Sequence, residues 1–296
     1  MERIINRQID SKEYNDLLQE ISAVIDRCVD FGGDVFSIIQ KNPRGEYVDS
    51  SISLILRDFL ELLDGVSTLV KSGCFEAAVP LLRSMFEHML YILYILDKHQ
   101  EDRAASYHVG HIKAKLASYS MFEQSDFLKD IEENTYSVTL PDLGSKEEAT
   151  AKLEELLLKG KYKVLNEEWI RTKKKNKKSP EWYSLFGGPK NLYELSKNQR
   201  RAGEYKILYK YWSTKTHGNS ALNNVVSGGF KAIRHPESIN MVGTWSLSWT
   251  FVVFLRILRF YQKRKQVTFG VLYMQIRNLY SRLSGKDLIK IIYEED

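Results

Sequence analysis

Two oppositely charged side chains stand in the middle of the most hydrophobic stretch of the sequence. Arg83 and Glu87 lie within 75–98, where most of the other residues are apolar. Because they are four residues apart, they project from one face of a helix, separated by roughly 40° around its axis. Arg83 could present a fixed fork of donors to an anion while Glu87 orients it. The alternative is an ion pair that satisfies itself and locks this helix to its neighbours.

A histidine after this pair gives the segment the Arg-x4-His spacing of helical HEPN nucleases, whose motif is Arg-x4-6-His. His88 lies five residues after Arg83, and the same spacing recurs between Arg103 and His108. The chain has 16 arginines and six histidines, so spacing alone does not establish a site. A five-residue step rotates a straight helix by about 140°, which points His88 away from Arg83. A catalytic His88 and an ordinary histidine on the helix surface or at an interface are both open interpretations.

A second segment combines aromatic side chains with a histidine. Tyr205, Tyr209, Ser213 and His217 follow one face of a predicted helix before Gly218 ends it. The helix dipole favours the charged form of a histidine near a helix C-terminus. His217 is therefore a candidate anion binder or general acid, and the alternative is that it caps the last carbonyl groups.

A cationic run forms the third candidate feature. Six of the eight residues from Arg171 to Lys178 are Lys or Arg. We expect a solvated or disordered lysine-rich loop here. The alternative is an arm that contacts phosphate groups of a substrate, with Lys174 and Lys175 as its binding residues.

Other catalytic and metal-binding patterns are missing from the sequence. His108 and His111 lie three residues apart with His99 nearby, but no carboxylate completes a metal set with the usual spacing. The sequence has no GxSxG element, no phosphate-binding loop pattern and no alternation of strands and helices. We therefore expect neither a metal nor a cofactor.

Composition favours a helical protein. The 296 residues include only 17 Gly and 6 Pro, too few for an architecture rich in tight turns. Hydrophobic residues at 43% and charged residues at 27% exclude a disordered chain, and the net charge of +5 is too mild to indicate nucleic acid by itself. Cys28 and Cys74 lie in apolar surroundings and are interpreted as reduced thiols.

The same composition predicts a cytoplasmic location. The first residues lack the apolar core and cleavage site of a signal peptide. The longest apolar stretch, 245–260, contains Arg256 and Arg259 and is shorter than the roughly 20 residues a bilayer requires. We expect no membrane span and no membrane partner.

Hydrophobic periodicity predicts an all-α fold, a multi-helix bundle that forms a single domain over 1–296. A capping box at 10–13 opens the first helix, and a second at 145–148 opens a later one. The other predicted helices cover 49–71, 75–98, 101–122, 192–197, 204–214, 237–265, 268–283 and 286–293. Residues 123–190 are predicted to be a partly mobile insert that carries the lysine-rich loop.

Three residues are expected to disturb these helices. Gly32 and Gly33 should weaken the far end of the first helix, because glycine is a poor helix former. Pro80 lies inside the pattern of 75–98 and should cause a kink or mark a helix start close to it.

Several of these segments, taken in order, resemble the bacterial family catalogued as domain of unknown function 5677. The resemblance rests on 74–87, on 102–107, on the segment around Trp182 and on 205–218, and it covers about 50–265. It implies a helical protein with a shared polar centre. That centre would comprise Arg83, Glu87, Arg103, Tyr209, Ser213 and His217. Proteins of this kind and HEPN-like helical proteins are associated with bacterial defence and toxin systems.

The first functional hypothesis is a metal-independent HEPN-like endoribonuclease of an antiviral defence or toxin system. His217 or His88 would take a proton from a ribose 2′-hydroxyl, Arg83 would stabilise charge on the phosphate, and Glu87 would orient Arg83. Arg103, Tyr209, Ser213, Lys174 and Lys175 would bind the substrate. RNA, a second copy in a homodimer and a defence-system partner protein are the expected partners.

The second hypothesis is a non-catalytic helical module. In it, the buried Arg/Glu/His centre is structural, or binds a nucleotide, another small anion or a partner protein. A third hypothesis is a nucleic-acid binder without chemistry, based on the 171–178 run and on basic residues in 256–265, and it demands steep salt dependence.

Overall fold

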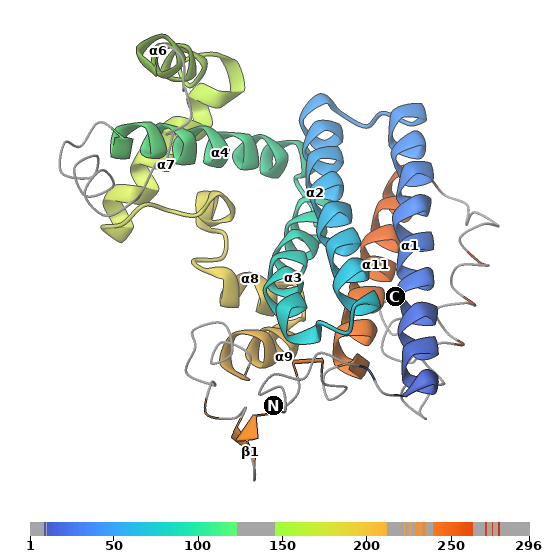
Figure 1. Ribbon diagram of the computed structural model, residues 1–296. Helices are drawn as coiled ribbons and strands as arrows, with labels where there is room; N and C mark the ends of the chain where they lie inside the picture. The colour runs from blue at the N-terminus through green and yellow to red at the C-terminus, as the bar shows by residue number, and fades with distance from the viewer. Residues whose placement is uncertain are drawn as a thin grey trace. The chain divides into compact units, whose positions relative to one another are not determined.

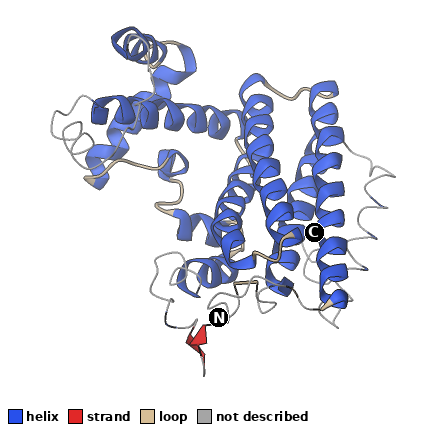
Figure 2. Ribbon diagram, viewed as in Figure 1, coloured by secondary structure: helices blue, strands red, loops and turns tan. Residues whose placement is uncertain are grey.

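The computed structural model describes residues 9, 11–122, 146–211, 222, 225–226, 229–230, 233–234, 239–262, 270, 274 and 278. These residues form two compact units. The first unit comprises Met1–Lys98 together with Ser196–Asp296, and the second comprises His99–Leu195. Helices dominate both units (Figure 2), which confirms the predicted all-α class.

Four long helices build the first unit. They are α1 (Lys12–Lys41), α2 (Glu46–Lys71), α3 (Phe75–Asp97) and α11 (Ile239–Tyr261). α1 packs against α2 and α11, and α3 packs against α2 and α11, so the four form a bundle around one core (Figure 1). The apolar residues that predicted the helices supply this core. The first helix begins next to the capping box predicted at 10–13, but its N-cap is Ser11, whose hydroxyl accepts a hydrogen bond from the Tyr14 backbone N–H at 3.2 Å. The N3 residue is Tyr14 and not Glu or Gln, so this cap is a single bond and not a capping box.

The glycine pair, which was predicted to weaken the far end of α1, does not interrupt the helix. The helix continues through both residues to Lys41. Gly32 is buried, and a Cβ built on it would lie 2.3 Å from Cδ1 of Leu60, a core residue of α2. The absence of a side chain at Gly32 therefore lets α1 and α2 approach closely, and their packing stabilises the helix there more than the poor propensity of glycine weakens it.

Pro80 is accommodated inside α3. The helix begins at Phe75 and Pro80 is its sixth residue. The start of the predicted range 75–98 is therefore confirmed, but Pro80 lies inside the helix and does not mark its start. The apolar packing of α3 on both neighbours compensates for the backbone hydrogen bond that proline cannot donate.

Two helices of the bundle are long and apolar enough to cross a membrane when length and composition alone are considered. They are α3 and the Met241–Tyr261 part of α11. In the folded protein 61% of the tested window in α3 and 72% of that in α11 is buried. Burial of this extent is typical of core helices in a bundle.

The second unit begins at His99, well before the insert predicted at 123–190. It consists of α4 (Gln100–Phe122), α6 (Lys146–Leu156), α7 (Gly160–Asn176), the 3-10 turn η1 (Trp182–Gly187) and most of α8 (Leu192–Asn198). α4 packs against α6, α7 and η1, and therefore belongs with the inserted segment. Gly110 allows the close contact with η1, since a Cβ there would lie 2.7 Å from Cβ of Trp182.

The lysine-rich run is mostly helical, which differs from the predicted loop. Residues 171–176 form the end of α7, and only Lys177 and Lys178 lie beyond it. Lysine and arginine are good helix formers, and cations near a helix C-terminus interact favourably with its dipole. These two effects explain why a strongly cationic segment continues the helix.

The remaining described elements are short. They are α9 (Ala202–Lys206), the π-helical turn η2 (Ile207–Tyr211), β1 (Val225–Val226) and β2 (Gly229–Phe230). The two strands pair antiparallel, with Val225 opposite Phe230. The helices predicted over 268–283 and 286–293, and the first part of the insert predicted over 123–190, lie largely or wholly outside the described residues.

Replacing Gly32 with alanine should destabilise the protein. The new Cβ would overlap the side chain of Leu60 in a packed core, and overpacking of this kind costs about 1–3 kcal/mol. Urea denaturation followed by circular dichroism measures the change in the free energy of unfolding.

Gly33→Ala is the matched control on the same helix. Nothing lies within 4 Å of a Cβ at Gly33, so alanine should stabilise the helix by about 0.5–1 kcal/mol. Equal effects of the two substitutions would contradict the close contact between α1 and α2.

Candidate functional site

The charged pair of α3 meets a tyrosine that is far away in the sequence. The Tyr209 hydroxyl donates a short hydrogen bond to Oε1 of Glu87. The Arg83 guanidinium carbon lies 4.4 Å from the centroid of the Tyr209 ring. All three side chains are half-buried. The structure therefore brings together three of the residues predicted for the polar centre, and we call them the Arg83–Glu87–Tyr209 cluster.

A second tyrosine extends the cluster by stacking. The rings of Tyr205 and Tyr209 are nearly parallel, with centroids 4.5 Å apart and an interplanar angle of 9°. Arg83 contacts the Tyr209 ring by a cation–π interaction, which is attractive because the ring face is negative. The guanidinium is consequently held by the face of a ring, and its planar fork of donors keeps a fixed orientation.

The backbone that carries Tyr209 is irregular. The sequence predicts an ordinary helix over 204–214, but residues 207–211 form a π-helical turn. Such a turn inserts an extra residue and changes the direction in which the following side chains point, and it is common at functional sites. The exposed Ile207 and the buried Leu208 show that this turn has one face on the core.

The surroundings of Tyr209 keep its hydroxyl protonated. Burial raises the pKa of Tyr209 far above its ordinary value of 10.0, and the charge of Glu87 together with its hydrogen bond raises that pKa further. The guanidinium of Arg83 lowers it in part. Tyr209 therefore acts as a neutral donor that positions Glu87, and the cluster as a whole offers an anion one fixed cation.

His88 makes its contacts along its own helix. Its Nδ1 lies 2.6 Å from the carbonyl oxygen of Ser84, so Nδ1 carries the proton and donates it. Its ring centroid is 6.3 Å from that of Tyr91. These contacts agree with the rotation that the five-residue spacing from Arg83 imposes.

The other predicted site residues belong to the second unit or lie outside the described residues. Arg103 is half-buried on α4, and Lys174 and Lys175 are exposed on the last turn of α7, so all three belong to the second unit. Ser213 and His217 lie outside the described residues. Across the part of the chain that the structure describes, no group of three or more His, Cys, Asp or Glu side chains is arranged to hold a metal ion.

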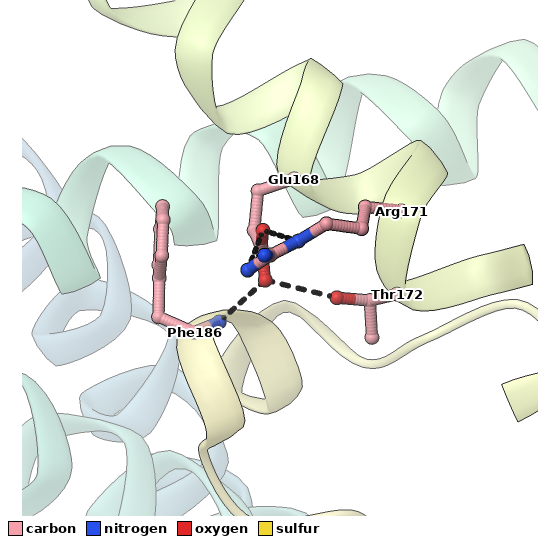
Figure 3. A network of polar contacts seen from close by, with 4 residues as sticks. All are labelled: Glu168, Arg171, Thr172 and Phe186. Atoms are coloured by element: carbon pink, nitrogen blue, oxygen red, sulfur yellow. Dashed lines mark hydrogen bonds and ion pairs between the residues drawn. The ribbon is translucent and has the colours of Figure 1, made fainter. Parts of the chain in front are cut away.

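Sequence reasoning missed a buried carboxylate in the second unit. Glu168 on α7 is only 7% exposed and accepts hydrogen bonds from three groups (Figure 3). A signal was present in the sequence, because Glu168 stands between Leu165 and Trp169 on the apolar face of its helix.

Comparison with known protein families matches residues 49–229 to a family described as "Family of unknown function (DUF5677)". The match covers more than half of the chain. The chain belongs to the DUF5677 family. The DUF5677 region includes the whole Arg83–Glu87–Tyr209 cluster and the second unit. It ends before α11, whereas the sequence analysis expected the resemblance to continue to about residue 265. No curated protein and no solved structure matches the chain.

Tyr209→Phe should lower the free energy of unfolding by about 1–3 kcal/mol, because the half-buried carboxylate of Glu87 would lose its donor. The effect should depend on pH. The folded state holds the Tyr209 proton more tightly than the unfolded state, so this contribution is fully present below about pH 10 and is lost as the pH rises toward the folded pKa.

Urea denaturation of wild type and Tyr209→Phe at pH 8 to 11 checks this. The difference between the two proteins should shrink as the pH rises above about 10. Tyr119→Phe, which removes a hydroxyl from a buried ring on α4, is the control. A difference that stays constant over the whole pH range would exclude the inferred role of the Tyr209 proton.

Proposed function

We propose that this protein is a metal-independent endoribonuclease, with Arg83 as the group that binds and stabilises the reacting phosphate. The observation that carries the proposal is the guanidinium of Arg83 held against the Tyr209 ring, while Tyr209 is in turn fixed by Glu87. A cation fixed before the substrate arrives requires little reorganisation during reaction, which is how enzymes stabilise developing negative charge.

The chemistry needs a base and an acid in addition to Arg83. A histidine takes the proton of a ribose 2′-hydroxyl, and the 2′-oxygen forms a bond to the adjacent phosphorus. The bond from phosphorus to the 5′-oxygen breaks, and that oxygen takes up a proton from a protonated histidine. The products are a 2′,3′-cyclic phosphate and a free 5′-hydroxyl, so no oxidant, reductant or metal enters the balance.

His217 and His88 are the histidines proposed for this proton transfer. His217 is favoured, because it follows Tyr209 by only eight residues and comes just before Gly218, where the sequence predicts the helical segment to end. His88 has one ring nitrogen engaged with its own helix, which leaves Nε2 as its acceptor. Glu87 is assigned to orientation, because it accepts the Tyr209 hydroxyl.

The biological setting is part of the same proposal. The resemblance to HEPN-like proteins supports a cytoplasmic nuclease of a bacterial antiviral defence or toxin system that works as a homodimer, with a partner protein that restrains or directs it. Pairing of two copies around a two-fold axis would place two equivalent sites at one interface.

A specific observation also favours a second candidate, a non-catalytic module that binds a nucleotide or another small anion. Within the described residues the cluster consists of a cation, a carboxylate and a neutral phenol, which is sufficient for binding without proton transfer. The two candidates differ in what Arg83→Ala removes: cleavage of RNA in the first, and stabilisation by a bound nucleotide in the second.

Purified protein should cleave single-stranded RNA in the presence of EDTA and leave cyclic phosphate ends. Arg83→Ala should lower the rate by about 10²- to 10³-fold, the usual effect of removing one group that stabilises transition-state charge. Arg83→Lys keeps the charge but loses the planar contact with Tyr209, so its rate should fall between those of wild type and Arg83→Ala. His217→Ala should abolish cleavage.

Arg57→Ala is the matched control for the arginine variants. Arg57 is 64% exposed and pairs with Asp58 and Glu61 on the surface of α2, so its loss should leave the rate unchanged. Absence of cleavage, or cleavage that survives both Arg83→Ala and His217→Ala, would exclude the ribonuclease. A nucleotide that raises the melting temperature of wild type but not of Arg83→Ala would then establish the binding module.

A further inference from the structure

An exposed phenylalanine with a left-handed backbone stands out in the second unit. Phe186 has φ 54° and ψ 33°, a conformation that side chains with a Cβ rarely adopt. The residue is 56% exposed, whereas Trp182, Tyr183 and Leu185 in the same turn are buried. Gly187 and Gly188 follow directly and would accept this conformation without strain. The turn therefore holds a large apolar ring in solvent at a cost in backbone energy.

A buried carboxylate fixes that conformation. Glu168 Oε1 accepts hydrogen bonds from the backbone N–H of Phe186 at 3.0 Å and from the Thr172 hydroxyl at 3.1 Å. Glu168 Oε2 accepts from Nε of Arg171 at 2.6 Å (Figure 3). One carboxylate thus joins the turn that displays Phe186 to the cationic end of α7. Strained, over-determined backbone of this kind is characteristic of functional sites.

Positive charge gathers around the same end of α7. Lys173, Lys174 and Lys175 are exposed on its last turn, and the side chain of Arg171 is 74% exposed even while it pairs with Glu168. Lys113 on the neighbouring helix α4 adds to this charge. Burial is the main cause that lowers the pKa of Lys113, and the charge of Lys173 lowers that pKa further. The lysines of two helices therefore repel one another, and the carboxylate of Glu154 offsets part of this effect on Lys113. A bound anion would relieve the remaining repulsion.

We propose that the exposed ring of Phe186 and the lysines at the end of α7 form a binding site for single-stranded RNA. The two features supply complementary parts of such a site: an aromatic face on which a base stacks, and cations that contact the phosphates on either side of it. A duplex does not suit the site, because its bases are already stacked on one another and present no free face.

The site goes beyond the proposed ribonuclease activity, because binding in the second unit requires neither Arg83 nor a reactive 2′-hydroxyl. Because binding and cleavage are independent in this proposal, the probe must bind without being cleaved. A fluorescent 2′-O-methyl oligouridylate keeps the bases and phosphates of RNA but cannot form a cyclic phosphate. Its binding to the full-length protein, followed by fluorescence anisotropy, reports the site whether or not the protein cleaves RNA.

Phe186→Gly is the decisive variant. It removes the ring while giving the turn a residue that adopts the left-handed backbone freely, so the melting temperature should stay the same or rise. Affinity for the probe should fall by about tenfold or more, the usual effect of removing an aromatic ring on which a base stacks. Phe186→Trp retains an aromatic face and should retain the affinity.

The lysines are tested by salt dependence. Affinity of the wild type for the probe should fall steeply between about 50 and 200 mM salt. The double variant Lys174→Gln, Lys175→Gln should have a smaller slope of log K against log salt, reduced by about 0.7 for each phosphate that is no longer neutralised. Lys163→Gln, an exposed lysine near the start of the same helix, is the control and should leave the slope unchanged.

Three results would overturn the inference. The first is equal affinity of wild type and Phe186→Gly for the probe. The second is a reduction of the salt slope in Lys163→Gln as large as that in the Lys174 and Lys175 variants. The third is tighter binding of an RNA duplex than of the single strand. Tighter binding of oligothymidylate than of the RNA probe would overturn the assignment to RNA. None of these results depends on whether the protein cleaves RNA, so the two proposals fail separately.

Discussion

The hydrogen bond from Tyr209 to Glu87 is the constraint on which the proposed site depends. A carboxylate and a guanidinium on a core helix are costly to remove from water unless their polar atoms are engaged. Here the donor comes from a residue 122 positions away, so the bond also ties the π-helical turn to α3. The same ring that donates to Glu87 presents its face to Arg83. One tyrosine therefore stabilises both charges of the pair.

Periodicity was sufficient to predict most of the bundle. The helices at 12–41, 46–71, 75–97 and 100–122 follow from apolar residues that recur every three or four positions. The meeting of Tyr209 with Arg83 and Glu87 was implied by the family resemblance and not by periodicity. The glycine pair of α1 shows where such reasoning ends. Propensity describes a helix in isolation, whereas the contact of Gly32 with Leu60 belongs to a pair of helices.

The second unit was harder to predict for a related reason. Its key interaction joins a helix side chain, Glu168, to the backbone N–H of Phe186, and a backbone donor is the same at every residue except proline. The residue type at position 186 therefore gives no indication that its backbone N–H binds Glu168. The left-handed conformation of Phe186 is equally invisible in the sequence, because positive φ angles are expected at glycine, as at Gly187 with φ 77°, and not at phenylalanine.

Glu87 and Glu168 each need hydrogen-bond donors because they lie away from bulk water, and they obtain these donors in different ways. Each lies on a regular helix and receives a hydrogen bond from an irregular turn, Glu87 from a side chain of η2 and Glu168 from the backbone of η1. In each case an arginine is held close by, through the Tyr209 ring or by direct pairing with the acid. A side-chain donor fixes the orientation of a ring, whereas a backbone donor fixes the φ and ψ angles of the residue that carries it. The first arrangement is suited to hold a cation for an incoming phosphate, and the second to hold an aromatic face in solvent. Substitutions that preserve charge but alter shape should therefore act mainly at Arg83, while substitutions that alter backbone freedom should act mainly at Phe186.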